Sequence, residues 1–419
     1  MEMDMMLREE FPKKISEMLE KRQFREIRGA LSILAPQDIG LVVEELEESE
    51  RLRVFRLLPK ETAAEVFVEM SPQNQEGLIK SFTDNELHEV LDQLYIDDTV
   101  DIIEEMPANV VKRILKNTDA ESRTAINQIL RYPKDSAGSI MTTEYIRLNK
   151  DMTVADAFAR IRRTGVDKET IYTCYVTERD RQLIGLVTVK DLLLADEDSE
   201  ISEIMTTNVI SVETSEDKET VAQTMSKYDF LAIPVVDTGN RLVGIVTYDD
   251  AADVLQEEAT EDIEKMAAIL PTDKPYLATG VWETWRKRIP WLLLLMVSAT
   301  FTSMILGHFN EKLAVIPILT IFIPMLMDTA GNAGGQASVT IIRSLSLGDV
   351  HMGDVLRVIW KEIRVAFLCG LSLAAVGFGK VILIDHASVM EALVVCLTLA
   401  LTVGFLVLLS HRNQKQKKA

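Results

Sequence analysis

The stretch Asp328-Thr-Ala-Gly-Asn-Ala-Gly-Gly-Gln336 lies inside an apolar segment that extends from Leu313 to Ile342. Polar backbone and ionisable side chains are costly in lipid, so within a membrane they normally face a helix bundle or a water-filled path. Asp328, Asn332 and Gln336 are spaced four residues apart, which places them on one face of a helix. This pattern indicates a membrane protein that moves a polar solute.

The small residues of the same stretch have two interpretations. Glycines let another backbone approach closely, as in a small-xxx-small packing face, and Pro317 and Pro324 weaken the helix. Packing alone leaves the polar stripe unexplained, whereas carboxylate, amide and carbonyl oxygens along a pore suit a hard cation. The predicted pore-lining residues are Asp328, Ala330, Gly331, Asn332, Gly334, Gly335 and Gln336.

Four apolar blocks predict four membrane spans, at about 291–307, 313–345, 365–384 and 392–410. Basic residues gather before the first span, between the second and third, and in the tail after the fourth: Arg286, Lys287, Arg288, Arg343, Arg357, Lys361, Arg364 and 411–419. Because positive charge favours the cytosolic side, we expect both termini in the cytosol and a multi-pass protein of the cell (inner or plasma) membrane.

Charge divides the chain into two parts. Residues from 281 onward hold 13 Lys+Arg and 8 Asp+Glu, net +5, and residues 1–280 hold the remaining 32 and 57, net −25. This acidity excludes a nucleic-acid partner. It suits cation binding, or only solubility. The N-terminus lacks signal-peptide features, and three cysteines without a CxxC pair fit the reducing cytosol.

An enzyme has little support in this sequence. The five histidines, at 88, 308, 351, 386 and 411, are scattered, and no catalytic triad, Walker loop or GxGxxG motif is visible. We therefore expect a non-enzymatic protein.

Residues 1–135 read as short amphipathic helices separated by Pro or Asp/Asn breaks, a pattern that predicts an α-solenoid. Ser71-Pro72 is typical of an N-cap followed by Pro at the first helical position. Further helix starts are predicted near Thr83-Asp84, Asp97-Asp98 and Pro107.

Residues 140–255 contain an internal repeat. Ile140-Met-Thr-Thr143 recurs as Ile204-Met-Thr-Thr207, and Leu183-Ile-Gly-Leu-Val-Thr-Val-Lys-Asp191 recurs as Leu242-Val-Gly-Ile-Val-Thr-Tyr-Asp-Asp250. This doubled β-α-β-β-α unit resembles a pair of CBS domains. In that family the Gly-x-x-Thr-x-x-Asp segment often holds an adenine nucleotide such as ATP, which makes Thr188, Asp191, Thr247 and Asp250 candidate nucleotide residues. The alternative is that Thr and Asp only cap the following helix.

Residues 253–280 predict an acidic helix and a linker that lead into the membrane part. Asp253, Glu257 and Glu261 share one helix face, and Glu258 and Asp262 share another. Like charges at this spacing repel, so the helix would gain from a divalent cation or a basic partner; a solvated surface is the alternative.

Together these features resemble the MgtE family of magnesium channels, on the strength of Gly-Asn-x-Gly-x-Gln336 and Glu258-Ala-Thr-Glu-Asp-Ile263. The resemblance implies a multidomain membrane protein: an α-helical superhelical domain (1–135), CBS domains (136–200 and 201–252), an acidic plug helix (253–280) and a transmembrane helical bundle (281–419). It further implies a homodimer that passes Mg²⁺ inward and that closes when cytosolic Mg²⁺ bridges the acidic domains. The implied sensor carboxylates are Glu65, Asp97, Asp101, Asp217, Glu219, Asp229, Asp250, Asp253, Glu258, Glu261 and Asp262.

The chain departs from the family in one respect. The family has five spans and an aspartate on the fifth, whereas four are predicted here, which leads to the hypothesis of a truncated or frame-shifted chain. One alternative function is therefore a membrane-anchored Mg²⁺ or nucleotide sensor that conducts nothing. Another is a CBS-regulated transporter of Co²⁺ or Ni²⁺, which the lack of His and Cys near the polar stripe disfavours.

Overall fold

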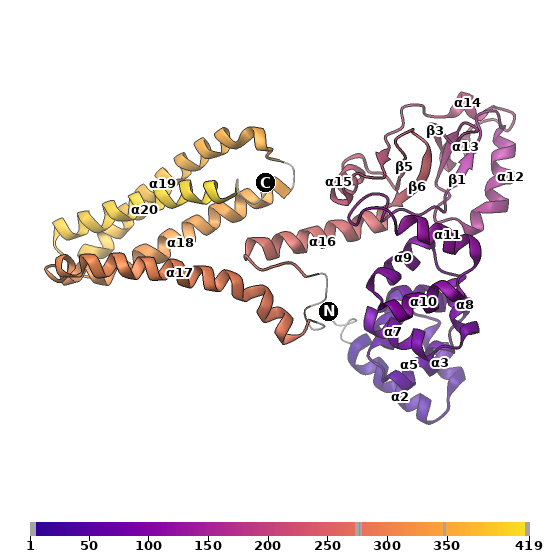
Figure 1. Cartoon of the computed structure of the whole chain (residues 1–419), viewed down its shortest axis with the longest axis horizontal. Helices are drawn as coiled ribbons and strands as arrows, with labels where there is room; N and C mark the ends of the chain where they lie inside the picture. The colour runs from indigo at the N-terminus through magenta and orange to yellow at the C-terminus, as the bar shows by residue number, and fades with distance from the viewer. Residues whose placement is uncertain (1–5, 273–275, 277–278, 347–348, 415–419) are drawn as a thin grey trace. The chain divides into compact units, whose positions relative to one another are not determined.

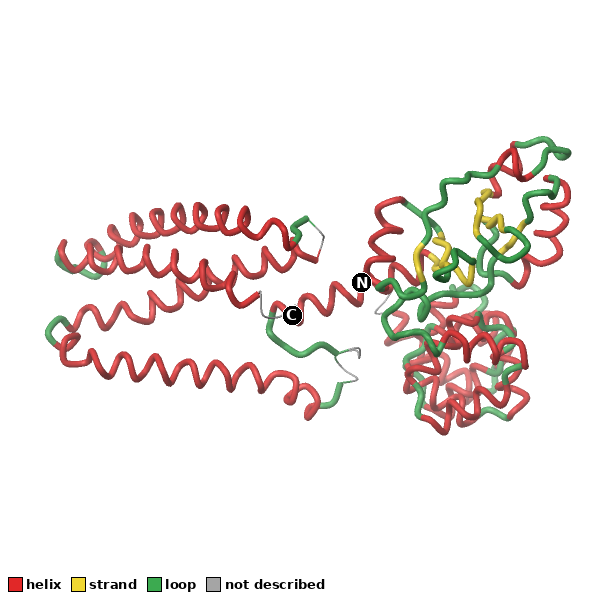
Figure 2. Tube along the Cα trace, turned by 45° about the horizontal axis from the view of Figure 1, so that its top comes forward, coloured by secondary structure: helices red, strands yellow, loops and turns green. Residues whose placement is uncertain are grey.

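The computed structural model describes the chain except for residues 1–5, 273–275, 277–278, 347–348 and 415–419. The described residues form two compact units, Met1–Leu255 and Gln256–Ala419 (Figure 1). Strands occur only in the first unit, and the described part of the second is helical (Figure 2). The predicted fold class, helices followed by an α/β repeat and then apolar helices, is confirmed. The tail lysines predicted at the cytosolic face lie outside the described residues.

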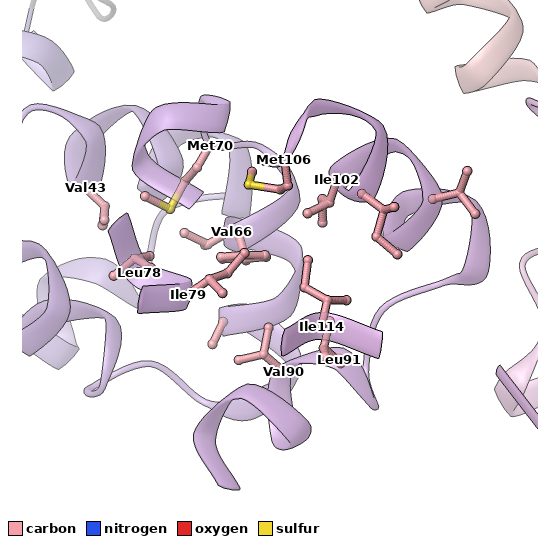
Figure 3. Close-up of a cluster of buried hydrophobic side chains, with 14 of the residues drawn as sticks. Val43, Val66, Met70, Leu78, Ile79, Val90, Leu91, Ile102, Met106 and Ile114 are labelled. Carbon is pink, nitrogen blue, oxygen red and sulfur yellow. The ribbon is translucent and has the colours of Figure 1, made fainter. Parts of the chain in front are cut away.

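The N-terminal part of the first unit is a run of short helices, as predicted. After a π-helical turn, η1 (Met6–Glu10), they are α2 (Phe11–Glu20), α3 (Phe24–Leu31), α4 (Pro36–Glu44), α5 (Glu48–Phe55), α6 (Lys60–Val68), α7 (Pro72–Ser81), α8 (Asp84–Leu91), α9 (Ile96–Glu105), α10 (Ala108–Asn117) and α11 (Ala120–Ile129). Helices two apart in the chain pack together, including α4 with α6, α6 with α8, and α8 with α10. Their apolar faces meet in one core, part of which is shown in Figure 3, where Val66, Ile79 and Ile114 lie together.

Helix starts in this domain follow the predicted signals closely. Thr83 caps α8 in a reciprocal pair with Glu86, as expected for a capping box. Ser71 precedes α7 as predicted, but its side chain makes no cap; its backbone N–H is bound instead by the carboxylate of Glu44 on α4. The predicted start at Asp97-Asp98 falls within the first turn of α9, whose N-cap is Tyr95.

The repeat folds into two three-stranded sheets. The first contains β1 (Ile146–Leu148), β2 (Thr173–Thr177) and β3 (Leu183–Thr188), and the second contains β4 (Val212–Glu213), β5 (Ala232–Val236) and β6 (Leu242–Thr247). In each sheet the first two strands are parallel and the last two antiparallel. The accompanying helices are α12 (Val154–Thr164), η2 (Gly165–Asp167), α13 (Val189–Leu194), α14 (Ile201–Ile204) and α15 (Lys218–Tyr228).

The two repeats hold each other through their shared Ile-Met-Thr-Thr motif. Thr142, in the first copy of the motif, pairs with Ile245 on β6, and Thr206, in the second copy, pairs with Leu186 on β3. Gly244 and Gly185 make room for this exchange, because a Cβ there would lie 2.5 Å from the Met141 sulfur and 2.7 Å from the Met205 sulfur. The glycines of the two Gly-x-x-Thr-x-x-Asp segments therefore have a packing role.

The second unit begins within α16 (Tyr248–Met266), which starts at the end of β6, and continues as α17 (Val281–Ala314), α18 (Pro317–Ser346), η3 (Met352–Asp354), α19 (Val355–Leu383) and α20 (Val389–Gln414). α20 packs against both α18 and α19. At the α19–α20 contact, a Cβ on Gly370 would lie 3.2 Å from the Ala400 carbonyl oxygen, so glycine permits the close approach.

Four helices occupy the four blocks predicted to span a membrane. Among the described residues two of them, α17 and α19, are long and apolar enough to cross a bilayer, and Val389–Val403 is a shorter apolar helix. α18 is 30 residues long and carries Asp328 and Asn332, which lower its hydropathy. It runs unbroken through Pro324, because an internal proline removes only one helical hydrogen bond.

Candidate divalent-cation site

A cluster of carboxylates lies where α9 of the helical domain meets the CBS pair. Asp97 and Asp98 occupy the first turn of α9, whose N-terminus favours negative charge. Asp97 is only 8% exposed, and among the described residues its Oδ1 atom has no hydrogen-bond partner. A buried, unsatisfied carboxylate oxygen is costly unless a proton or cation compensates it.

The first CBS repeat supplies Glu144, just before β1, and Glu169, before β2. The Oε2 atom of Glu144 accepts a hydrogen bond from the backbone N–H of Ile96 (3.2 Å), which ties it to the start of α9. The Glu169 N–H donates to the Glu144 carbonyl oxygen (3.0 Å), which fixes the two residues side by side. Asp97, Glu144 and Glu169 each place a carboxylate oxygen within 4.8 Å of the others.

The second CBS repeat adds Asp249 and Asp250 at the start of α16. Asp250 accepts a hydrogen bond from the Thr247 hydroxyl (2.6 Å), and its burial raises its pKa to about 7. Burial, with Asp249 as the leading charge, also raises the pKa of Glu169 to about 8 and that of Asp98 to about 6. Burial raises the pKa of Asp97 well above its usual value, with Asp250 and Glu169 adding to the effect.

These shifts have one origin. The leading charge effects on these four carboxyls come from neighbouring carboxylates, and desolvation adds to each. Ionised together they would repel strongly in a partly desolvated site. The cluster can relieve this repulsion by taking up protons or by binding a cation, and carboxylate oxygens are ligands that suit Mg²⁺ or Ca²⁺.

Of the eleven predicted sensor carboxylates, two lie in this cluster, Asp97 and Asp250. Glu65 is exposed on α6 and Asp101 is exposed on α9, one turn beyond Asp97. Asp217 caps α15 by accepting from the Glu219 and Thr220 N–H groups (3.0 and 3.4 Å). Glu219 accepts from the Gln223 side chain (3.0 Å), and Asp229 ends α15 in a left-handed conformation (φ 54°).

The predicted plug residues all lie on α16. Asp253 is exposed in the first unit, while Glu258, Glu261 and Asp262 belong to the second and are half-buried there. Glu261 pairs with Lys265 (2.7 Å). α16 is a single helix from Tyr248 to Met266, so the clustered Asp249 and Asp250 and the plug residues share one continuous element.

Sequence reasoning missed Asp98, Glu144, Glu169 and Asp249 as members of the cluster. A signal existed in the differences between the repeats. Glu144 follows the first Ile-Met-Thr-Thr motif, whereas Asn208 follows the second, and Asp249 stands where the first repeat has Lys190. An acidic residue at only one of two matched repeat positions indicates a site that is not duplicated in the other repeat.

The candidate nucleotide residues adopt the capping geometry. Thr188 and Asp191 form a capping box at the start of α13, with the Thr188 hydroxyl 2.6 Å from the Asp191 carboxylate. Thr247 and Asp250 repeat this contact. The second pair lies in the carboxylate cluster, which would repel a phosphate group, whereas Lys190 stands beside the first pair.

On α18, the polar stripe and the packing surface occupy different faces. Asp328, Asn332 and Gln336 are exposed, and the last two line a shallow groove with Gly331, Gly335, Val339 and Thr340. A Cβ on Gly331 or Gly335 would meet nothing within 4 Å among the described residues. Gly334 is half-buried, and Ala330 is buried (1% exposed) on the opposite face, away from the stripe.

These features define a membrane protein with a soluble, acidic regulatory part. Family profiles agree: "MgtE intracellular N domain" matches residues 34–135, "CBS domain" matches 137–198 and 201–257, and "Divalent cation transporter" matches 323–412.

Curated relatives cover most of the chain. The magnesium transporter MgtE of Thermus thermophilus is 37% identical over 92% of this chain and 86% of its own length, and that of Bacillus subtilis is 30% identical over 92% and 85%. The chain belongs to the MgtE family of magnesium transporters.

Solved structures resemble the soluble part. The cytosolic domain of the Mg²⁺ channel MgtE in complex with ATP has a TM-score of 0.55 at 37% identity, covering 58% of this chain and 99% of that one. The soluble part of a magnesium transporter has a TM-score of 0.56 at 31% identity, covering 60% and 99%.

Proposed function

We propose that this chain transports Mg²⁺ across the cell membrane and that cytosolic Mg²⁺, bound by the carboxylate cluster, regulates the transport. Family membership supports Mg²⁺ as the transported ion. The observation that carries the regulatory part is the convergence of Asp97, Glu144 and Glu169 within 4.8 Å, in a place where two of their oxygens lack hydrogen bonds among the described residues.

The spacing of the cluster fits a small hydrated cation. Mg²⁺ takes octahedral oxygen ligands at about 2.1 Å, so that opposite ligands lie about 4.2 Å apart, and it usually keeps several waters. Three oxygens within 4.8 Å can therefore close on the ion directly or hold it through water.

Binding there would link domains. Asp97 belongs to the helical domain, Glu144 and Glu169 to the first CBS repeat, and Asp250 to the first turn of α16. When the ion is bound, the carboxylates of all these elements are attracted to it. Without the ion, the carboxylates repel one another. A ligand that prefers the closed arrangement shifts the population toward it. α16 also carries the acidic residues Asp253 to Asp262, so the ion would act on the predicted plug through a continuous helix.

The transport path is proposed along the exposed face of α18. Asp328, Asn332 and Gln336 supply a carboxylate and two amides, and the bare glycines between them expose backbone. Such oxygens can contact a cation that keeps its hydration shell. Ala330, on the opposite face, would support the helix by packing.

Uptake of Mg²⁺ tests transport. Expression in a magnesium-dependent bacterial strain is expected to restore growth at low Mg²⁺, and Asp328→Asn is expected to reduce it. Failure to restore growth by a chain that reaches the membrane would favour the non-conducting sensor. Growth inhibition by Co²⁺ or Ni²⁺ without Mg²⁺ uptake would favour another divalent cation.

An adenine nucleotide and a second copy of the chain complete the proposal. The ATP complex of the related cytosolic domain supports a nucleotide at the CBS pair, and Lys190 makes the first repeat, with Thr188 and Asp191, the better phosphate site. Asp191→Asn is expected to weaken ATP binding to the purified chain more than Thr247→Ala does.

A homodimer is expected, and light scattering of the purified chain would measure it. The regulatory part is expected to lie in the cytosol.

A further inference from the structure

α17 is longer than a membrane span requires. Its 34 residues extend about 51 Å at the usual rise per residue, whereas the hydrocarbon core is about 30 Å thick. The uninterrupted apolar sequence begins at Trp291, and the charged residues of the helix start all precede it. The segment Val281–Pro290, here called the entry segment, therefore lies outside the hydrocarbon core.

The entry segment is amphipathic in a particular way. At about 100° per residue, Val281, Trp285, Ile289 and Trp282 fall within an arc of about 100° on one side of the helix. Arg288 falls about 20° beyond one edge of this arc and Arg286 about 40° beyond the other. The apolar face is thus flanked on both sides by arginine.

Side-chain exposure and pairing agree with this arrangement. Val281 is 87% exposed, Trp282 79% and Trp285 51%, and the two indoles pack edge to face with ring centroids 5.3 Å apart. Arg286 and Arg288 are exposed, and the described residues offer neither of them an ion-pair partner. Lys287, on the far side of the helix, is paired with Glu283 (3.6 Å).

Pro290 stands at the junction between the entry segment and the apolar part. It lacks an N–H group, so the helical hydrogen bond to the Arg286 carbonyl is absent, and an internal proline bends a helix. α17 is bent in Figure 1. Such a bend tilts the entry segment away from the axis of the apolar part of α17, while the helix stays continuous through the headgroup layer.

We propose that the entry segment lies in the headgroup layer of the cytosolic leaflet and binds anionic phospholipid. Tryptophan favours this layer, with its ring at the apolar boundary and its N–H toward water. Arginine forms paired, charge-assisted hydrogen bonds with phosphate. Two exposed guanidinium groups on either side of a tryptophan face match a lipid phosphate above an acyl chain.

The proposal has a consequence for regulation that rests on the proposed function. The Leu270 N–H donates to the Lys287 carbonyl oxygen (3.3 Å), and the Thr272 N–H donates to the Glu264 carboxylate on α16 (2.8 Å). The described residues after α16 are therefore tied to the entry segment on one side and to α16 on the other. Lipid binding would hold the membrane-side end of the connector that carries the acidic plug residues.

Tryptophan fluorescence tests the location of the entry segment. The chain has four tryptophans, so Trp291→Phe/Trp360→Phe leaves only Trp282 and Trp285 as reporters. In nanodiscs, lipids brominated near the headgroup are expected to quench this full-length variant more strongly than lipids brominated deep in the chain. Full accessibility of these two tryptophans to aqueous iodide, with no quenching by either lipid, would place the entry segment in water and would overturn the proposal.

Charge substitution tests the lipid specificity. Binding of phosphatidylglycerol relative to phosphatidylcholine, measured by native mass spectrometry of the purified chain, is expected to fall about fivefold for each arginine lost in Arg286→Gln/Arg288→Gln. The matched control Lys13→Gln/Lys14→Gln removes two exposed charges from α2 and is expected to leave binding unchanged. An unchanged preference for phosphatidylglycerol in the arginine variant would refute the binding of anionic lipid by the entry segment.

Both measurements are made without Mg²⁺ flux. A chain that transports Mg²⁺ normally while Trp282 and Trp285 stay in water would refute this inference alone. Shallow quenching in a chain that transports nothing would leave it standing while the proposed transport fails.

Discussion

The two CBS repeats share one scaffold but differ at the ends of their last strands. Both pair their Ile-Met-Thr-Thr motif with the other repeat, and both place a threonine hydroxyl 2.6 Å from an aspartate. Lys190 is next in sequence to the aspartate of the first pair. In the second repeat this position is Asp249, and Glu144, Glu169 and α9 lie close to it. The duplicated backbone provides two equivalent positions, and single charged residues make one of them the candidate cation site.

The largest expected effect comes from removing cluster ligands. Asp97→Asn/Glu169→Gln is expected to stabilise the Mg²⁺-free chain, because repulsion falls, and to abolish its stabilisation by Mg²⁺. For the native chain that stabilisation is expected to be about 2.7 kcal/mol at an ion concentration of 100 Kd. Thermal unfolding of the full-length protein with and without Mg²⁺ measures it.

The control for this pair is Asp191→Asn, which changes the counterpart of the clustered Asp250 in the other repeat. It should keep the full Mg²⁺ response. An undiminished response in the double variant would show that the cluster is not the regulatory site.

Alanine at the paired glycines tests the shared scaffold. Gly185→Ala and Gly244→Ala would press a Cβ against Met205 and Met141, and overpacking of this kind costs about 2 kcal/mol. Because the contacts are equivalent, we expect similar losses of unfolding free energy in urea denaturation. A loss at only one position would mean that the repeats do not hold each other symmetrically.

Exchanging the charges sharpens the comparison further. Asp249→Lys gives the second repeat the lysine that the first repeat has at this position, Lys190. Its positive charge would offset the repulsion between the carboxylates in place of Mg²⁺. The Mg²⁺ concentration needed for half-maximal stabilisation is expected to rise about tenfold, which corresponds to about 1.4 kcal/mol.

The reverse change, Lys190→Asp, is the matched control. It should create no Mg²⁺ response at the first repeat, because Asn208 stands there in place of a glutamate. Appearance of a second response would mean that one carboxylate suffices.

The smallest expected effect is that of pH. The cluster pKa values of about 6, 7 and 8 lie above the usual value of about 4, so ionisation is harder in the folded state. Without Mg²⁺, this group's contribution to stability is full below about pH 4 and is lost as the pH rises through 8.

Protons therefore compete with Mg²⁺. We expect the half-maximal Mg²⁺ concentration to be about three- to tenfold higher at pH 6.5 than at pH 7.5, since binding releases protons. Calorimetry in buffers of different ionisation enthalpy would measure that release. The Asp97→Asn/Glu169→Gln variant should release no protons when Mg²⁺ is added, and an equal release from both proteins would place the origin of the protons elsewhere.

Local patterns were sufficient for most of the fold. The repeated Ile-Met-Thr-Thr and Gly-x-x-Thr-x-x-Asp motifs predicted the paired CBS units, and Thr83 predicted the start of α8, because repeats and caps act over a few residues. The sequence predicted a membrane span from about 291 but gave no start for the helix that contains it, which begins at Val281. The apolar content of a sequence indicates where a helix enters the lipid, but it does not indicate where the helical hydrogen bonds begin.

The sequence by itself determined that acidic soluble domains precede apolar helices and that Asp328, Asn332 and Gln336 share one face. These properties follow from composition and from the helical period. Only the tertiary structure decided which carboxylates meet. Asp97, Glu144, Glu169 and Asp250 lie far apart in the chain, and their proximity depends on the packing of α9 against the CBS pair. Burial and mutual repulsion arise from that proximity, and they distinguish the candidate cation site from the many acidic residues of the surface.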